Sequence, residues 1–203
     1  MLVETTGEAN PEQLPLLESA EKSHAWKVQH SSDRSTWGTP PHVFEAINKD
    51  FGFDLDAAAS KASRLCPDWY GPDHRRPTRR DALVVEWTLA NGKVPSAVFV
   101  NPPYGRNLTK KWVEAAWRNS RNTTVVALVM ACTETVWWRT WAWRADEIRL
   151  VQSRIRFVDP DTGAASGSAP KGSAIVVFRP YVPAEGWPGG PRIILWEQPD
   201  PAT

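Results

Sequence analysis

Ala97-Val98-Phe99-Val100 runs directly into Asn101-Pro102-Pro103-Tyr104, and this stretch decides the fold. Its four apolar residues have the composition of a short buried strand. Two consecutive prolines cannot donate hydrogen bonds to a neighbouring strand, so the chain must leave the sheet there. Polar residues at the carboxyl end of a buried strand are typical of ligand sites in α/β proteins. We therefore expect Asn101 and Tyr104 to lie in a functional site.

The segments on both sides of this strand alternate between helical and strand patterns. Thr39-Pro40-Pro41 opens a helix that Thr39 can cap and that Gly52 ends. Residues 53–58 predict a short strand ending in small residues, and 124–130 form a β-branched strand after a helix that carries Leu108, Trp112, Ala115 and Ala116. This alternation predicts an α/β fold with a mostly parallel central sheet.

The second half of the sequence is richer in strand patterns. We expect Thr133 to cap a helix with Val136, Trp137, Trp141 and Ala145, followed by strands at 148–151, 155–158 and 174–178. The last strands suggest a C-terminal β-hairpin, and the Gly, Ser and Ala content of 159–173 predicts a flexible segment between them. The helical spacing of Trp137, Trp138, Trp141 and Trp143 favours core packing over base stacking.

Composition limits the class of protein. A chain of 203 residues with 41% hydrophobic and 23% charged residues suits one globular domain, and no apolar run reaches the roughly 18 residues of a membrane span. The acidic, polar start resembles no signal or transit peptide, which predicts a cytoplasmic location. A net charge of +1 restricts any DNA contact to local patches. Cys66 and Cys132 match no zinc spacing, so we expect no metal. We divide the chain into a flexible arm (1–34), a central domain (35–182) and a Pro/Gly-rich tail (183–203).

The tetrapeptide 101–104 suits methyl transfer to an exocyclic amine. If the Asn101 side-chain oxygen and the Pro102 carbonyl accept the two amine hydrogens, the nitrogen lone pair is freed for attack on a methyl group. A rigid turn at Pro102 and Pro103 would hold that carbonyl outward, and Tyr104 offers a face for stacking a flipped base. A proline turn beneath a tyrosine with no ligand is the alternative.

These residues resemble the amino-methyltransferases of DNA, in particular the compact phage family of DNA N-6-adenine methyltransferases (Dam-like), over residues 36–180. The resemblance implies a Rossmann-like fold that binds S-adenosylmethionine. Trp37, Thr39 and Pro40 resemble the segment that closes over the methionine part of that cofactor, although Thr-Pro-Pro opens many helices without a ligand. Asp56 and Ala57 resemble the first cofactor motif, although Asp56 could instead lie on a solvated strand face. The glycine-rich loop of many methyltransferases is absent.

Further site residues follow from the same resemblance. Asp81 and Ala82 resemble the segment that binds the cofactor adenine, or a simple turn cap beside Arg80. Asn101 would contact the cofactor as well as the base. Tyr104 and Phe157 would contact the two faces of the target base, although Phe157 could equally be core. The basic residues that could grip DNA phosphates, or be solvated surface, are Arg75, Arg76, Arg79, Arg80 and Lys171.

The resemblance implies transfer of a methyl group to the 6-amino group of adenine in double-stranded DNA after base flipping. It places the protein in a bacterial host cell, encoded by a phage or prophage, and associates it with restriction-modification. The alternatives are methylation of another planar amine (a cytosine amine, RNA adenine or protein glutamine) and a catalytically inactive DNA-binding relative. No pattern in the sequence indicates an oligomeric state.

Overall fold

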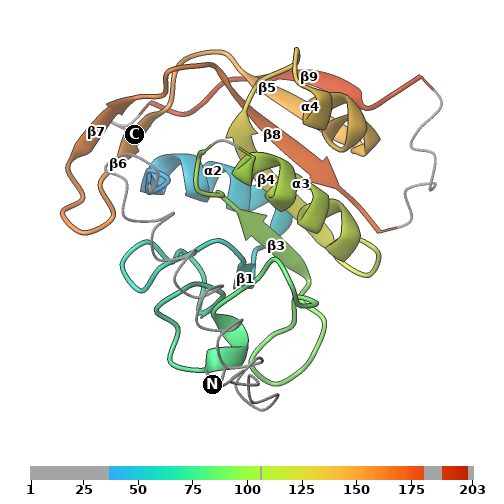
Figure 1. The fold of residues 1–203 in the computed structure, drawn as a ribbon. Helices are drawn as coiled ribbons and strands as arrows, with labels where there is room; N and C mark the ends of the chain where they lie inside the picture. Colours follow the sequence, from blue (N-terminus) through green and yellow to red (C-terminus); the bar gives the residue numbers. More distant parts are fainter. Residues whose placement is uncertain (1–36, 106, 181–188, 201–203) are drawn as a thin grey trace, which may run out of the picture. The chain divides into compact units, whose positions relative to one another are not determined.

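The computed structural model describes residues 37–105, 107–180 and 189–200 (Figure 1). The arm predicted over residues 1–34 lies outside them. The described residues belong to one compact unit. Among its helices none is long and apolar enough to cross a membrane.

A seven-stranded sheet in the order β2-β1-β3-β4-β8-β5-β9 forms the centre of the unit. Strand β8 is antiparallel to both of its neighbours, and every other pair in the sheet is parallel. The prediction of a mixed α/β fold with a mostly parallel sheet is confirmed. The strands are β1 (Leu55–Asp56), β2 (Asp68–Trp69), β3 (Ala97–Val100), β4 (Thr124–Met130), β5 (Glu147–Val151), β8 (Ser173–Phe178) and β9 (Arg192–Trp196).

Helices cover the two faces of this sheet. Helix α2 (Pro41–Phe51) packs Val43, Phe44 and Ile47 against one face, where Phe99 of β3 belongs to the same buried cluster. Helix α3 (Leu108–Asn119) packs on the other face beside β4, and the short helix α4 (Val136–Thr140) lies next to it (Figure 1). Strand residues of β3, β4 and β8 are buried on both faces, as expected for a sheet with helices on each side.

Register brings the ends of three strands together at one edge. Asp56 of β1 lies between Phe99 of β3 and Trp69 of β2 in adjacent parallel strands. The chain therefore leaves all three strands at the same level, so the loops that follow them lie side by side. The hairpin of β6 (Arg156–Val158) and β7 (Ala165–Ser168) reaches this edge through a backbone bridge from Val158 to Gly38.

Several predictions are wrong in detail. Pro40 occupies the N-cap of α2, and the side chain of Thr39 caps nothing. Thr135, and not Thr133, caps α4, which ends after five residues and continues as the 3₁₀ helix η2 (Ala142–Arg144). The segment expected to be flexible contains β7, which pairs with β6.

The Pro/Gly-rich tail contains a strand that sequence analysis did not predict. Residues Arg192–Trp196 pair with β5 in parallel register and form the edge of the sheet. Part of the predicted tail therefore belongs to the central domain. Of the tryptophans assigned to the core, Trp138 is buried, while Trp143 remains 47% exposed.

A buried carboxylate joins three arginines at the β5 side of the sheet. Glu147 is 1% exposed, and its oxygens accept hydrogen bonds from Arg149 and Arg192, with Arg179 at 3.5 Å. Burial alone would raise the pKa of Glu147, yet the arginines hold it below its ordinary value. The folded state thus prefers the ionised carboxylate, and this contribution to stability is lost as the pH falls through the acid range.

We predict that Glu147→Ala lowers the free energy of unfolding by about 3 kcal/mol, because the arginines lose their buried carboxylate partner. The loss stays near this value because part of the arginine charge remains exposed to water. Urea unfolding at pH 7 would measure the loss. The matched control is Glu134→Ala, whose exposed pair with Lys171 should leave the stability unchanged. Equal effects of the two substitutions would contradict the prediction.

Candidate active site

The side chain of Asn101 is fixed by segments far from it in sequence. Its Nδ2 donates to the backbone oxygen of Trp37 at 2.9 Å and to the Thr39 hydroxyl at 3.0 Å. These two bonds use both amide hydrogens, so they determine which way the amide oxygen faces. Thr39 therefore orients Asn101 instead of capping helix α2.

The amide oxygen of Asn101 faces Tyr104. The Tyr104 hydroxyl donates to Asn101 Oδ1 at 3.0 Å and lies 3.4 Å from the Leu128 carbonyl oxygen. Burial raises the pKa of Tyr104 well above its ordinary value, so the hydroxyl stays protonated and can donate. An amide oxygen has two lone pairs, which leaves Asn101 able to accept one more hydrogen.

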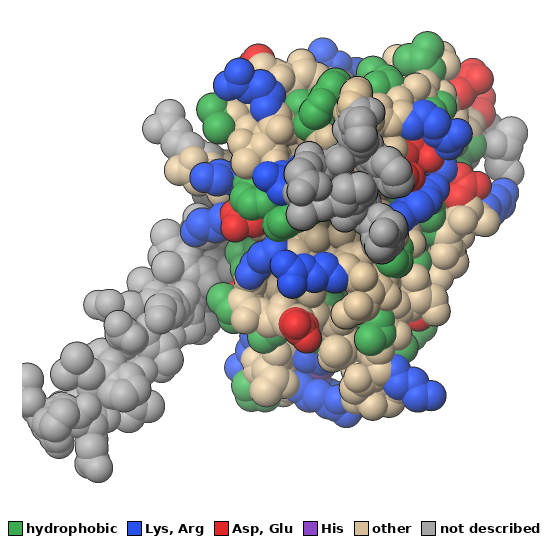
Figure 2. All heavy atoms as spheres, turned by 90° about the vertical axis from the view of Figure 1, so that its right-hand side faces the viewer, with side chains coloured by type: hydrophobic (Ala, Val, Ile, Leu, Met, Phe, Trp, Pro, Cys, Tyr) green, Lys and Arg blue, Asp and Glu red, His purple; other side chains and the backbone are tan. Residues whose placement is uncertain are grey.

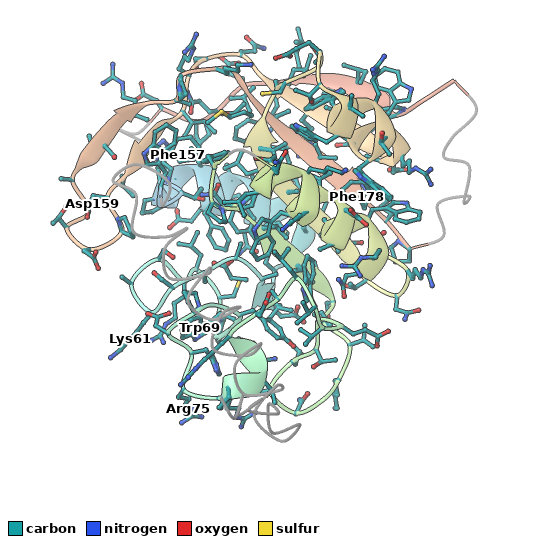
Figure 3. The ribbon with its side chains drawn as sticks, viewed as in Figure 1. Lys61, Trp69, Arg75, Phe157, Asp159 and Phe178 are labelled. Atoms are coloured by element: carbon teal, nitrogen blue, oxygen red, sulfur yellow. The ribbon has the colours of Figure 1, made fainter. Side chains whose placement is uncertain are left out.

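Three aromatic rings, one of them that of Tyr104, pack against one another beside this amide. The rings of Trp37 and Phe157 are stacked, with centroids 5.3 Å apart and an interplanar angle of 23°. Tyr104 lies 5.6 Å from Trp37 and 6.0 Å from Phe157, edge-on to the latter. Phe157 comes from β6, at the left of the ribbon in Figure 3. The structure thus brings Tyr104 and Phe157 together as predicted, with Trp37 as a third ring.

Asp56 is the second polar group of the site. It is 3% exposed, and its carboxyl accepts hydrogen bonds from the backbone N–H groups of Ala58 and Leu65 at 3.3 and 3.2 Å. Burial raises the pKa of Asp56 to about 7 despite these two bonds. Asp56 is therefore buried, contrary to the alternative of a solvated strand face.

One cleft connects these groups. Its walls include Trp37, Thr39, Asp56, Phe99 and Asn101. Ser63 and Leu65, from the loop after β1, also line it, and its volume is only about 20 Å³. It combines an amide oxygen, a buried carboxyl and small residues at the carboxyl edge of the sheet. This arrangement can orient a planar amine beside a polar ligand. Burial raises the pKa of the nearby Cys66 thiol to about 12, which disfavours the reactive thiolate.

Comparison with known proteins agrees with this geometry. The profile of the DNA N-6-adenine-methyltransferase (Dam) family matches residues 27–195, which include every residue of the cleft. The chain belongs to this family.

Two phage proteins named DNA N-6-adenine-methyltransferase are similar to this family member. The protein of Escherichia phage T1 is 27% identical over 164 residues, which cover 72% of this chain and 63% of the phage protein. The protein of Haemophilus phage HP1 is 28% identical over 155 residues, which cover 75% and 83% of the two chains. The chain thus spans somewhat less than two thirds of the T1 protein.

Other predicted site residues of this Dam-family chain lie outside the cleft. Asp81 accepts a hydrogen bond from the backbone of Leu83, the turn-cap geometry given as its alternative. Ala82 is buried, and its carbonyl oxygen accepts from the Trp87 indole. Neither residue forms a hydrogen bond with Asp56 or Asn101 in the part of the chain that the structure describes.

The basic residues predicted to contact DNA divide into two groups. Arg79 is only 4% exposed, because it pairs with Asp68 and donates to the carbonyls of Trp69 and Thr88, so it is structural. Lys171 pairs with Glu134. Arg75, Arg76 and Arg80 remain exposed.

Sequence analysis missed two parts of the cleft wall. Ser63 and Leu65 follow β1 but carry no motif, and their position depends on hydrogen bonds such as that from Leu65 to Asp56. The sequence predicts Trp37 to contact the cofactor, but gives no sign of its stacking on Phe157. The backbone bridge between Gly38 and Val158, residues adjacent to these two rings, brings their segments together. No local pattern could have indicated it.

We predict that Asp56 makes stability depend on pH. A carboxyl with a raised pKa binds its proton more tightly in the folded chain, so its contribution falls as the pH rises from about 4 to about 7. The unfolding free energy of the wild type minus that of Asp56→Asn should decrease by up to about 4 kcal/mol as the pH rises over this range. Urea unfolding of both proteins at about pH 4.5 and about pH 8, near the two ends of that window, would measure the decrease. Parallel pH curves for the two proteins would refute the role of Asp56.

Proposed function

We propose that this protein transfers a methyl group from S-adenosylmethionine to the exocyclic 6-amino group of adenine in double-stranded DNA, with the base flipped into the cleft at Asn101. The observation that carries the proposal is the fixed Asn101 amide, whose oxygen faces an aromatic cluster at the carboxyl end of β3. The family match and the names of the two phage relatives support the same reaction. The fold would be the Rossmann-like type of these enzymes.

Asn101 would make the amine nucleophilic. Its oxygen accepts one amine hydrogen and the Pro102 carbonyl accepts the other, which draws the nitrogen lone pair out of conjugation with the ring. The hydrogen bonds that Asn101 Nδ2 donates to Trp37 and Thr39 keep the amide in this orientation before the base arrives. Preorganised acceptors need no rearrangement during the reaction. A nitrogen–carbon bond forms, and the amine then releases one proton to solvent.

Tyr104 and Phe157 would hold the base between them. A planar base needs about 7 Å between the rings that sandwich it, since carbon atoms contact at 3.5–4.0 Å. Their centroids are 6.0 Å apart and edge-on, and Trp37 fills the space beside Phe157. We therefore propose that the base displaces the Trp37 ring from Phe157. Stacking of the base would compensate for the separation of these two rings.

The residues around Asp56 fit S-adenosylmethionine chemically. The Asp56 carboxyl receives only two backbone hydrogen bonds, so its remaining lone pairs can accept from polar hydrogens of the cofactor. Ala58 leaves room near the backbone, whereas Ser63 and Leu65 must shift to admit a ligand of this size. The predicted contact of Ala57 with the cofactor stays a prediction, since Ala57 is fully buried. When bound, S-adenosylmethionine supplies an electrophilic sulfonium methyl group and is left as S-adenosylhomocysteine. Roles for Pro40, Asp81 and Ala82 beside it stay predictions.

The first experiment is transfer of a labelled methyl group from S-adenosylmethionine to unmethylated duplex DNA, with nucleoside analysis of the product. We expect N6-methyladenine, and a loss of at least about 100-fold in rate for Asn101→Ala, the effect of removing one preorganised hydrogen-bonding group. The matched control is Asn91→Ala, an exposed asparagine before β3. Label in cytosine, RNA or a protein amide, with none in DNA adenine, would overturn the assignment.

A second prediction separates the ring of Tyr104 from its hydroxyl. Tyr104→Phe keeps the stacking face and should change KM for DNA by no more than about threefold, whereas Tyr104→Ala should raise it by about 5- to 150-fold, since one base–aromatic stack contributes about 1–3 kcal/mol. Steady-state kinetics on a short duplex would measure both. Equal losses in the two variants would show that the hydroxyl, and not the ring, binds the base.

A further inference from the structure

A second and larger pocket lies at the outer edge of the sheet beside β2. It has a volume of about 460 Å³. Its basic walls come from two neighbouring loops, one after β1 with Lys61 and Arg64 and one after β2 with Arg75 and Arg76. Figure 3 shows Lys61 and Arg75 pointing outward on one side of the ribbon, with Trp69 between their loops. We call this the basic pocket.

The positive charge of the basic pocket is not neutralised within the described part of the chain. Its two carboxylates are already engaged, since Asp68 pairs with the buried Arg79 and Asp73 accepts from the backbone N–H of Lys61. Lys61, Arg64 and Arg75 form no ion pair with any described residue. The basic pocket is thus lined by four exposed cations, whereas both of its carboxylates already bind other groups. The face shown in Figure 2, on another side of the molecule, mixes basic, acidic and apolar side chains instead.

The floor of the basic pocket favours phosphate over a nucleobase. Trp69 is 6% exposed and lies edge-on to His74 at 4.6 Å, so neither ring offers an open face for stacking. Burial lowers the pKa of His74, and the nearby guanidinium groups lower it further, which indicates a positive local potential. Guanidinium and ammonium groups without a stacking surface suit phosphate oxygens.

The basic pocket and the Asn101 cleft share one loop as a wall. Ala58, Ser63 and Leu65 of this loop line the cleft, whereas Lys61 and Arg64 line the basic pocket. Trp69 and Phe99 both lie beside Asp56 in register, one strand away on either side, so their backbones are about 10 Å apart. The two sites are therefore close enough to contact the same DNA strand within a few nucleotides of each other.

We propose that the basic pocket binds backbone phosphates of DNA within a few nucleotides of the target base, through Lys61, Arg64, Arg75 and Arg76. The inference rests on the proposed function for the identity of the DNA. It adds Lys61 and Arg64 to the arginines predicted from sequence and excludes Arg79. Phosphates fixed there would position the strand so that the flipped base meets Asn101.

The test compares two triple variants that remove the same charge. Lys61→Ala/Arg64→Ala/Arg75→Ala empties the basic pocket of three cations. The control, Lys49→Ala/Lys93→Ala/Arg121→Ala, removes three exposed cations that precede β1, β3 and β4, at the opposite ends of the strands. Fluorescence anisotropy would give Kd for a short duplex over a range of salt concentrations. Circular dichroism and thermal unfolding would establish that both variants are folded.

We expect the slope of log Kd against log salt to fall by about 0.9 for each phosphate that the protein no longer neutralises, hence by about 2–3 in the pocket variant, and to stay unchanged in the control. S-adenosylmethionine binding, measured by calorimetry, should be the same in all three proteins. Methyl transfer by the pocket variant should show a raised KM for DNA with kcat preserved.

Three results would overturn the inference. Equal slopes in both variants would show that the pocket cations do not contact DNA. Loss of S-adenosylmethionine binding in the pocket variant would assign the pocket to the cofactor. Wild-type binding of ATP that the pocket variant loses, with no change in DNA slope, would assign it to a free nucleotide phosphate. If the pocket variant changes the slope but the wild-type protein methylates no DNA, the result would support the pocket and refute the proposed function.

Discussion

Two prolines at the end of one buried strand determine where the chemistry of this protein can occur. Pro102 and Pro103 cannot continue the hydrogen bonding of β3, so the chain turns out of the sheet immediately after Val100. Asn101 is thereby placed at the carboxyl edge, two residues beyond Phe99, the partner of Asp56 in the adjacent strand. The parallel pairing of β1 with β3 therefore places both the amide and the carboxyl in the cleft.

Long-range hydrogen bonds then turn this edge into an oriented site. Asn101 binds Trp37 and Thr39, more than 60 residues earlier, and the same segment pairs with β6 through Gly38. The start of the described chain, the loop after β3 and the β6–β7 hairpin thus meet around one amide. A change in any of them would alter the position of the Asn101 oxygen without touching a substrate.

Sequence patterns predicted the interior of the fold well, and four of the residues that they single out, Trp37, Thr39, Asp56 and Asn101, line one cleft. The β-branched run of β4 was placed at its observed bounds, because burial on both faces leaves a clear apolar signal. Thr39 was misassigned as a cap because its partner, Asn101, is distant in sequence. Strand β9 was missed because its pairing with β5, and not its flanking Pro and Gly residues, makes it a strand. Arg79 was grouped with its exposed neighbours because charge patterns carry no information on burial.

In the proposed reaction, the hydrogen bond from Tyr104 to Asn101 would influence release of the methylated base. An unmethylated amine brings two hydrogens to the acceptors at Asn101 and Pro102, whereas a methylated amine retains only one. The Tyr104 hydroxyl lies 3.0 Å from the Asn101 oxygen and stays protonated, so it occupies one lone pair of that oxygen throughout and leaves the other for the base. After transfer the base has given up one of its two donors, while the tyrosine keeps its own. The methylated base would thus be held by one hydrogen bond fewer while the internal bond is unchanged, which favours departure of the modified base.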